Sequence, residues 1–237
     1  MPHSTKETIA IAWCDPGMVD GKFMDGIINL MFWAEKNKIN IVNKIRSNGN
    51  QISRQRQGVF NVWSENNLSD WLLWIDSDIV LTPQAFKLIW DSADKILKPV
   101  VSGTYFVSKE NEESLMEPFP ALFKEGRHKH EIQIIHPLPK NQLIEIDSAG
   151  FGFLLMHKSI IEKIRKVSPN YSLFAEEEGV KDDYVSEDIV FFRKLKETGI
   201  KSYAHTGAIV QHMKRFSLDL NYYNAYWNGI EKGLIIK

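Results

Sequence analysis

Two aspartates one residue apart, in the triplet Asp76-Ser77-Asp78, are the residues of this sequence whose types and spacing best suit chemistry. Carboxylate oxygens are the ligands that Mg²⁺ and Mn²⁺ prefer, and a pair at this spacing can share a cation with the phosphate oxygens of a nucleotide. A polar turn that leaves a strand and caps the next helix has the same residue types. The triplet alone is equally compatible with that structural role.

A second acidic pair, Glu187-Asp188, stands at the start of a predicted helix over residues 186–198. A carboxylate there is stabilised by the free N–H groups of the first turn and can face a substrate as a general base. Helix capping explains either residue alone equally well. His205 and His212 lie in the segment that follows, where a histidine can bind a metal but is more often structural.

The strands that would position these residues are strongly apolar. Residues 8–14 form an apolar run closed by Asp15-Pro16-Gly17, and residues 71–75 lead directly into the triplet. Such runs are typical of interior strands of a parallel sheet, which are buried on both faces. Because ligands bind beyond the carboxyl ends of these strands, we expect Asp15 and the triplet to line one crevice.

Helices and strands alternate along the chain, which predicts an α/β fold with a doubly wound sheet and a less regular, mixed β region in the middle. The predicted helices cover residues 22–36, 51–66, a segment that opens at Thr82-Pro83, 159–166 and 186–198, the last ended by Gly199. The further predicted strands cover residues 39–42, 99–107, 143–146, 151–156, 201–204 and 208–211. Helical spacing predicts core positions at Phe23, Ile27, Leu30, Met31 and Ala34, and at Ile52, Val59, Phe60 and Trp63.

The composition narrows the class of protein. Lys and Arg number 29 against 30 Asp and Glu, so a general nucleic-acid-binding surface is not expected, although a local basic patch would escape this count. The single cysteine, Cys14, cannot form an internal disulfide, which suits a reducing compartment. No stretch has membrane-spanning length and the N-terminus lacks the pattern of a signal peptide, so we expect a cytoplasmic protein.

Three segments resemble the GT-A class of glycosyltransferases, particularly small stand-alone enzymes of phages and large viruses. They are DWLLWIDSDIVLTP around Asp76, DSAGFGFLLMHKSIIEKI from Asp147, and SEDIVFFRKLKETGIKSYAHTGAIVQH from Ser186. The resemblance extends from Ile9 to about Lys214. It implies a Rossmann-like, mostly parallel central sheet flanked by helices, with a smaller mixed β region, in one domain over residues 1–215 followed by a helical tail over 216–237.

The resemblance also implies a metal site and a donor. In this class the Asp-x-Asp triplet binds Mn²⁺ or Mg²⁺ together with a nucleoside diphosphate sugar, a role that maps onto Asp76 and Asp78. A late histidine commonly completes the metal shell, and His212 matches that position better than His205. A UDP-sugar is the favoured donor.

For the acceptor side, the resemblance maps the general base of inverting members onto Asp188, with Glu187 orienting the acceptor. A glycan or another hydroxyl compound is the expected acceptor. The acidic stretch over residues 176–183 fits either a solvated loop or a mobile lid over the acceptor. The sequence fixes neither the donor sugar nor the choice between inverting and retaining chemistry.

The remaining site predictions concern contacts with the donor. Related enzymes carry an arginine near the base or the phosphates, and Arg56 matches it better than Arg54, although Gln57 stands where the class usually has Asn. The other expected donor contacts are Asp15, Pro16, Gly17 and Ser77 at the crevice, Gly150 and Gly152 beneath the sugar, and Lys214 near the diphosphate.

Other functions share some of these features. An aspartyl-phosphate phosphatase also uses Asp-x-Asp after an apolar strand, but it usually places the triplet on the first core strand. A nucleotidyltransferase would need a glycine-rich phosphate loop after the first strand, and Asp15-Pro16-Gly17 is no such loop. A non-catalytic sugar-binding module would not need the Glu187-Asp188 pair.

Overall fold

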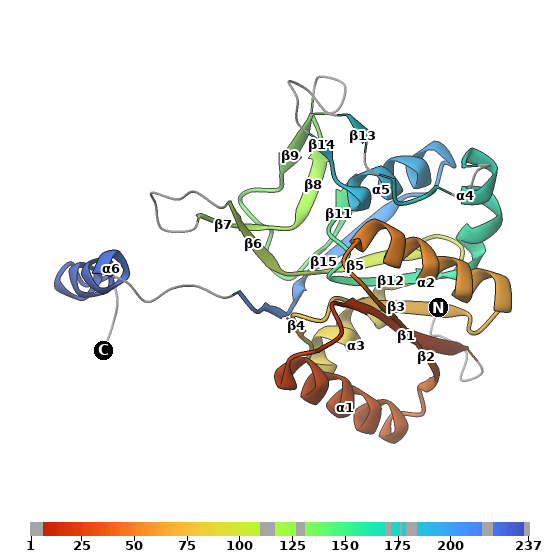
Figure 1. The fold of residues 1–237 in the computed structure, drawn as a ribbon, viewed down its shortest axis with the longest axis horizontal. Coiled ribbons are helices and arrows are strands. Elements are labelled where there is room, and N and C mark those ends of the chain that lie inside the picture. The colour runs from red at the N-terminus through yellow and green to blue at the C-terminus, as the bar shows by residue number, and fades with distance from the viewer. Residues whose placement is uncertain are drawn as a thin grey trace.

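The computed structural model describes residues 7–109, 117–126, 131–168, 172–175, 177–178, 184–214 and 220–234. The predicted domain boundary at residues 215 and 216 and most of the acidic stretch 176–183 lie outside these ranges. The centre of the fold is a seven-stranded sheet with helices on both faces (Figure 1). In order across the sheet, the strands are β10 (Leu143–Ile146), β15 (Ser202–Ile209), β5 (Val100–Thr104), β12 (Phe153–His157), β3 (Trp71–Ile75), β1 (Thr8–Asp15) and β2 (Asn40–Asn48).

The sheet is mixed but mostly parallel, as predicted. β12 runs antiparallel to both β3 and β5, and β10 runs antiparallel to β15, whereas the pairs β1–β2, β1–β3 and β5–β15 are parallel. The carboxyl ends of β1, β2 and β3 therefore lie at one edge of the sheet. All five residues of β3 and all five of β12 are buried, which explains their continuous apolar sequence.

Helices α1 (Gly21–Lys36) and α3 (Pro83–Ser92) cover one face of the sheet, and α2 (Ile52–Asn66), α4 (Ile161–Val167) and α5 (Glu187–Glu197) cover the other (Figure 1). A short 3₁₀ helix, η1 (Lys158–Ile160), precedes α4. Alternate residues of β3 enter opposite cores: Leu72 and Trp74 pack with α2 and α5, and Leu73 and Ile75 pack with α1 and α3.

Helix ends follow the sequence signals. Thr82 caps α3, its hydroxyl accepting from the Ala85 amide at 3.2 Å, and Pro83 occupies the first turn, as predicted. Gly199 follows α5 with φ 76°, the left-handed conformation expected of a residue that ends a helix.

Several predicted elements differ from those observed. The strand predicted at residues 39–42 continues to Asn48, the two strands predicted at 201–204 and 208–211 form the single β15, and the strand predicted at 99–107 is interrupted at Tyr105. Met31 and Ile52, predicted in the core, are 43% and 37% exposed. In each helix the buried stripe instead includes residues that the apolar pattern did not select: Gly26 in α1, and Gln55 and Arg56 in α2.

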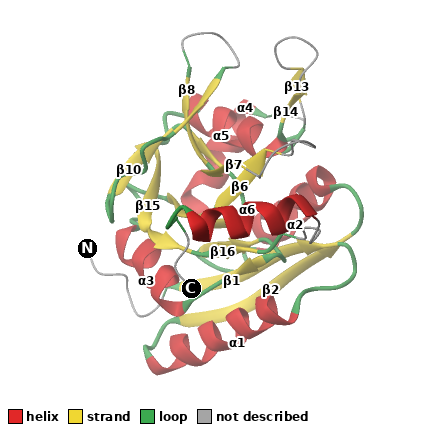
Figure 2. Cartoon of the chain, turned by 90° about the vertical axis from the view of Figure 1, so that its left-hand side faces the viewer, coloured by secondary structure: helices red, strands yellow, loops and turns green. Residues whose placement is uncertain are grey.

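The smaller β region is made of short antiparallel strands. A separate pair of two-residue strands lies beside Asp78 and includes His212. Together, these strands are β4 (Ile79–Val80) with β16 (Gln211–His212), β6 (Phe106–Lys109) with β7 (Glu117–Pro120), β8 (Leu122–Glu125) with β9 (Ile132–Ile134) and β11 (Ser148–Ala149), and β13 (Glu177–Glu178) with β14 (Tyr184–Val185). The last described helix, α6 (Leu220–Glu231), stands away from the body of the fold in Figure 1, and in the perpendicular view of Figure 2 it lies in front of the fold. No helix within the described ranges has both the length and the apolar character needed to cross a membrane.

Candidate functional site

A cavity of about 1120 Å³ lies at the carboxyl ends of β1, β2 and β3. Its lining includes many of the residues that the sequence selected: Asp15, Pro16, Arg56, Asp76, Ser77, Asp78 and Lys214. The apolar strands β1 and β3, with the more polar β2 beside them, thus bring polar side chains to one edge of the sheet, as expected of an α/β fold.

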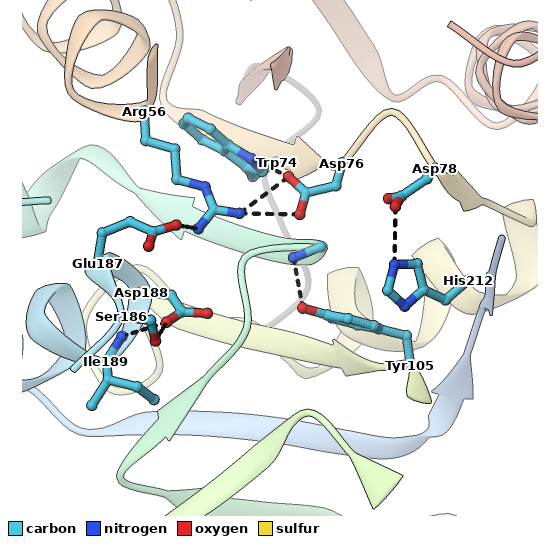
Figure 3. Close-up of polar contacts among 11 residues, drawn as sticks. Arg56, Trp74, Asp76, Asp78, Tyr105, Ser186, Glu187, Asp188, Ile189 and His212 are labelled. Atoms are coloured by element: carbon cyan, nitrogen blue, oxygen red, sulfur yellow. Dashed lines mark hydrogen bonds and ion pairs between the residues drawn. The ribbon is translucent and has the colours of Figure 1, made fainter. Parts of the chain in front are cut away.

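Asp78 and His212 are brought together by the pairing of β4 with β16. This pairing sets His212 opposite Ile79, and the Met213 amide donates to the Asp78 carbonyl at 2.8 Å. His212 Nε2 lies 3.0 Å from Asp78 Oδ2 (Figure 3). His205, the competing histidine, lies in β15 opposite Leu143, where its Nδ1 accepts from the Gly207 amide at 3.1 Å.

The contact between His212 Nε2 and Asp78 Oδ2 requires a positive charge between the two atoms. His212 Nδ1 lies 2.9 Å from the Phe106 carbonyl oxygen, which can only accept, so Nδ1 carries a proton. In the neutral imidazole Nε2 then presents a lone pair to a carboxylate oxygen. Either a second proton or a cation must lie between the two atoms. Burial acts to raise the pKa of Asp78, but the hydrogen bond and charge of His212 and the charge of Lys214 outweigh it, so the pKa is lowered.

Asp76 points toward Arg56 rather than toward His212 (Figure 3). Arg56 Nη2 lies 3.1 Å from Asp76 Oδ2, and its Nη1 donates to Glu187 Oε1 at 2.5 Å. The Trp74 indole N–H donates to Asp76 Oδ1 at 3.2 Å. Arg56 therefore joins Asp76, which directly follows β3, to the start of α5.

This arginine is buried, with 5% of its surface exposed, and its guanidinium stacks 5.1 Å from the centre of the Phe151 ring. Burial alone would lower its pKa, but the charges of Asp76, Asp188 and Glu187 raise it, so Arg56 stays protonated. For Glu187 the balance is the opposite, because burial raises its pKa more than Arg56 lowers it. Arg56 Nε has no hydrogen-bond partner in the part of the chain that the structure describes.

Asp188 has a different environment from Glu187. It is half-buried, and its Oδ1 accepts from the Ile189 amide at 2.8 Å and from the Ser186 hydroxyl. Oδ2 of Asp188 makes no such contact with the described residues. The pair predicted from the sequence thus divides into a buried carboxylate that contacts an arginine and a half-buried one whose Oδ2 has no hydrogen-bond partner among the described residues.

Both carboxylate oxygens of Asp15, at the end of β1, accept hydrogen bonds from neighbouring residues. Arg46 donates to it in a bidentate pair, through Nε at 2.6 Å and Nη2 at 2.8 Å. The Gly17 amide donates to Oδ1 at 2.7 Å and the Trp13 indole N–H to Oδ2 at 3.0 Å. Arg46 is the largest cause of the lowered pKa of Asp15. Sequence reasoning missed Arg46 because the predicted strand ended at residue 42.

Gly150 and Gly152 make room for Tyr105. A Cβ atom on Gly150 would lie 1.9 Å from the Tyr105 hydroxyl oxygen, and one on Gly152 would lie 2.7 Å from the same ring. The hydroxyl accepts from the Gly152 amide at 3.2 Å, and the ring meets His212 edge to face at 5.3 Å. Tyr105 therefore accounts for the absence of side chains at both glycines, and its ring packs against the imidazole of His212.

The predicted metal ligands Asp76, Asp78 and His212 do not form one cluster in the structure. Within the described ranges, no three His, Cys, Asp or Glu side chains are close enough together to hold one ion. Asp78 and His212 are adjacent, whereas Asp76 is turned to Arg56. Two carboxylates and an imidazole form a donor set that suits Mn²⁺.

Comparisons with known proteins give structural relatives only, since no family model and no curated protein sequence matches the chain. Similar solved structures include A197 from STIV, with 17% identity, a TM-score of 0.49 and coverage of 88% of this chain and 86% of that chain. GalNAc-T7, crystallised with UDP, GalNAc and Mn²⁺, has 9% identity, a TM-score of 0.57 and coverage of 89% and 44%. A glycosyltransferase involved in the glycosylation of the major capsid of PBCV-1 has 13% identity, a TM-score of 0.48 and coverage of 89% and 94%.

The likeness to GalNAc-T7 supports a shared fold, although the identity is low and this chain spans less than half of that one. It agrees with the mixed, mostly parallel sheet, the helices on both faces and the polar cavity at the strand ends. The fold predicted from the sequence is confirmed: the chain has the GT-A fold of glycosyltransferases.

Proposed function

We propose that the protein is a metal-dependent glycosyltransferase that moves a hexose-type sugar from a nucleoside diphosphate sugar, a UDP-sugar by preference, to an acceptor hydroxyl. The observation that carries this proposal is the contact between His212 Nε2 and Oδ2 of Asp78, a residue of the cavity lining. The UDP, GalNAc and Mn²⁺ in the GalNAc-T7 structure support the choice of donor and metal.

At 3.0 Å apart, His212 Nε2 and Asp78 Oδ2 are close enough together to serve as ligands of one cation. The proton that His212 Nδ1 donates to the Phe106 carbonyl leaves Nε2 to face the metal, and such a hydrogen bond is typical of a metal-bound histidine. Asp78 and His212 would thus hold Mn²⁺ or Mg²⁺, with Asp76 as the third ligand.

When bound, the cation would act as a Lewis acid on the diphosphate leaving group. Lys214 is exposed at the same cavity and carries a positive charge that can offset the developing phosphate charge. Asp15 is already held by Arg46, so its part is to fix the turn at Pro16 and Gly17 against which the nucleotide would lie.

Asp188 is the proposed general base. Its free Oδ2 can accept the proton of an acceptor hydroxyl while Oδ1 stays fixed by the Ile189 amide. Glu187 is held inside by Arg56, so it positions the arginine and, through it, Asp76. This assignment corresponds to an inverting reaction, in which the acceptor oxygen attacks the anomeric carbon opposite the departing diphosphate.

The test is metal-dependent hydrolysis of a panel of nucleotide sugars by the wild type and by Asp78→Ala. The variant should lose the Mn²⁺-dependent reaction and bind Mn²⁺ more weakly in titration calorimetry, while its circular dichroism stays unchanged. Asp91→Ala is the control, because Asp91 is an exposed carboxylate on α3 that pairs with Lys87. Unchanged turnover in Asp78→Ala would refute the assignment. Release of phosphate from generic monoesters would favour the phosphatase instead.

A further inference from the structure

Beyond the metal, the cavity continues past the end of β1 to the residues that follow β2, Gly49 and Asn50. If the diphosphate lies at Asp78 and His212, the sugar-proximal phosphate is at β3 and the nucleoside extends along the row of strand ends toward β2. The base therefore belongs at the β2 end of the cavity. Gln55, on the first turns of α2, lines the cavity at this end.

The side chain of Gln55 is buried, and its carbonyl oxygen, Oε1, lacks a hydrogen-bond donor among the described residues. Of the whole residue, 9% is exposed. A buried acceptor without a donor lowers the stability of the folded chain, so such a group is rare unless a ligand completes it. Gly49 is a neighbour of this side chain, since a Cβ atom on Gly49 would lie 3.7 Å from Gln55 Nε2, an ordinary van der Waals contact.

We propose that Gln55 is the residue that reads the base of the donor nucleotide, through the imide edge of uracil. This inference rests on the proposed function. A carboxamide offers one acceptor and one donor side by side, and rotation about its last torsion angle exchanges them. Gln55 Oε1 accepts from the N3–H of uracil while Nε2 donates to the neighbouring O4 carbonyl. Thymine carries the same edge.

Two other polar side chains near this end, Asn50 and Asp15, are less suited to this role. Asn50 also carries a carboxamide, but it is exposed to solvent, whereas Gln55 is buried. Asp15 has both oxygens engaged, Oδ1 by Gly17 and Arg46 and Oδ2 by Trp13 and Arg46. Its carboxylate is also in the wrong form, since it can accept but not donate. Gln55 supplies both halves of the required pattern from a rigid helix.

The test is calorimetric titration with UDP, dTDP, CDP, ADP and GDP in the presence of Mn²⁺. The proteins are the wild type, Gln55→Leu, Gln55→Glu and the control Gln51→Glu. Gln51 is the exposed N-cap of α2 and makes no side-chain capping bond, so its variant adds the same charge without touching the cavity lining. Thermal melting without ligand establishes that each variant is folded.

We expect the wild type and Gln51→Glu to bind UDP more tightly than the other ribonucleotides. Gln55→Leu should weaken UDP and dTDP binding about ten-fold, the loss of one or two hydrogen bonds. Gln55→Glu should weaken UDP by a similar factor and shift the preference toward GDP, because a carboxylate accepts from the adjacent N1–H and N2–H of guanine. Should Gln55→Glu fail to fold, the loss of UDP preference in Gln55→Leu decides the question.

The possible failures are distinguishable. If the wild type binds none of these nucleotides, the proposed function itself is wrong. If the wild type prefers UDP and both Gln55 variants keep the same affinities and order, the donor proposal stands and the role of Gln55 is overturned. A wild type that prefers another base overturns the uracil assignment.

Discussion

Arg56 decides how the site is held together in the absence of ligand. One guanidinium nitrogen contacts Glu187 and the other contacts Asp76, so a single buried cation separates two carboxylates that would otherwise repel each other. Removing one partner of such a buried group leaves uncompensated charge, which costs more than the pair contributes.

We predict that Arg56→Met lowers the free energy of unfolding by about 3–5 kcal/mol, because it leaves Glu187 buried without its partner. Arg54→Met should change it by less than about 0.5 kcal/mol, since Arg54 is an exposed arginine on the same helix. Urea denaturation measures both. Adding Glu187→Gln to Arg56→Met should recover part of the loss. A loss below about 1 kcal/mol in Arg56→Met would show that the bridge is not structural.

At the scale of single residues, the sequence identified which residues belong to the site better than it identified the residues that they contact. Arg56 was selected from its helix and from the resemblance, but its partner Glu187 is 131 positions later, a relation that no local pattern contains. Tyr105 gave no signal, because its role arises from the space that Gly150 and Gly152 leave for it. Gln55 was not selected because a polar residue on a helix is ordinarily exposed.

At the scale of elements, the position of the triplet depends on how closely α1 approaches the chain after β4. A Cβ atom on Gly26 would lie 2.9 Å from the Leu81 carbonyl oxygen and 3.0 Å from its nitrogen. These are backbone atoms, which cannot turn aside as a side chain can. Leu81 follows the triplet by three residues, so the absence of a side chain at Gly26 fixes where Asp78 stands.

Gly26→Ala should therefore destabilise the protein by about 1–3 kcal/mol, an overpacking cost, and weaken Mn²⁺ binding. Gly58→Ala is the matched control, since nothing lies within 4 Å of its would-be Cβ in α2. That variant should stabilise the protein by about 0.5–1 kcal/mol through helix propensity. Thermal melting and calorimetry report the two effects. Equal responses in the two variants would contradict the close approach.

A buried histidine at the end of β12 makes stability depend on pH. His157 caps η1, its Nδ1 accepting from the Ser159 amide at 3.1 Å, and burial lowers its pKa from 6.5 to about 4. Between these values the unfolded chain binds the proton and the folded chain does not. Stability from this group is therefore complete above pH 6.5 and is lost as the pH falls toward 4.

We predict that His157→Asn, which keeps a capping oxygen but cannot titrate, flattens this acid limb. From pH 7 to pH 4 the wild type should lose up to about 3 kcal/mol more than the variant. Urea denaturation at a series of pH values gives the comparison. Parallel pH profiles for the two proteins would exclude His157 as the cause.

Elements with a strong pattern were predicted well, and those set by tertiary pairing were not. The runs that form β1 and β3 are apolar throughout, and their bounds were predicted closely. β2 is an edge strand whose second half, Lys44 to Asn48, is polar except for Ile45, so its sequence resembles a loop. β15 passes through Thr206-Gly207, which signals a turn locally, and a shift in register with β5 accommodates it.

At the scale of the whole molecule, α6 adds no residue to either of the two main hydrophobic clusters of the described chain. We predict that truncation after Lys214 leaves the melting temperature within about 2 °C of the wild type, the range of a neutral change. Truncation after Ile209 should lower it, because it also removes β16 and with it His212. A large loss on the first truncation would show that the tail is part of the domain.

The position of β12 bears on how this chain folds as it is made. β3 and β5 are completed by residue 104, yet they are not neighbours, because the strand that joins them spans Phe153–His157. A nascent chain of about 150 residues therefore holds five strands of the sheet in three separate groups, β10, β5 and β3–β1–β2, each with an open edge. The ribosome must release β12 before the edges of β3 and β5 can close, so the position of Asp76-Ser77-Asp78, which directly follows β3, becomes fixed only after two thirds of the protein has been synthesised.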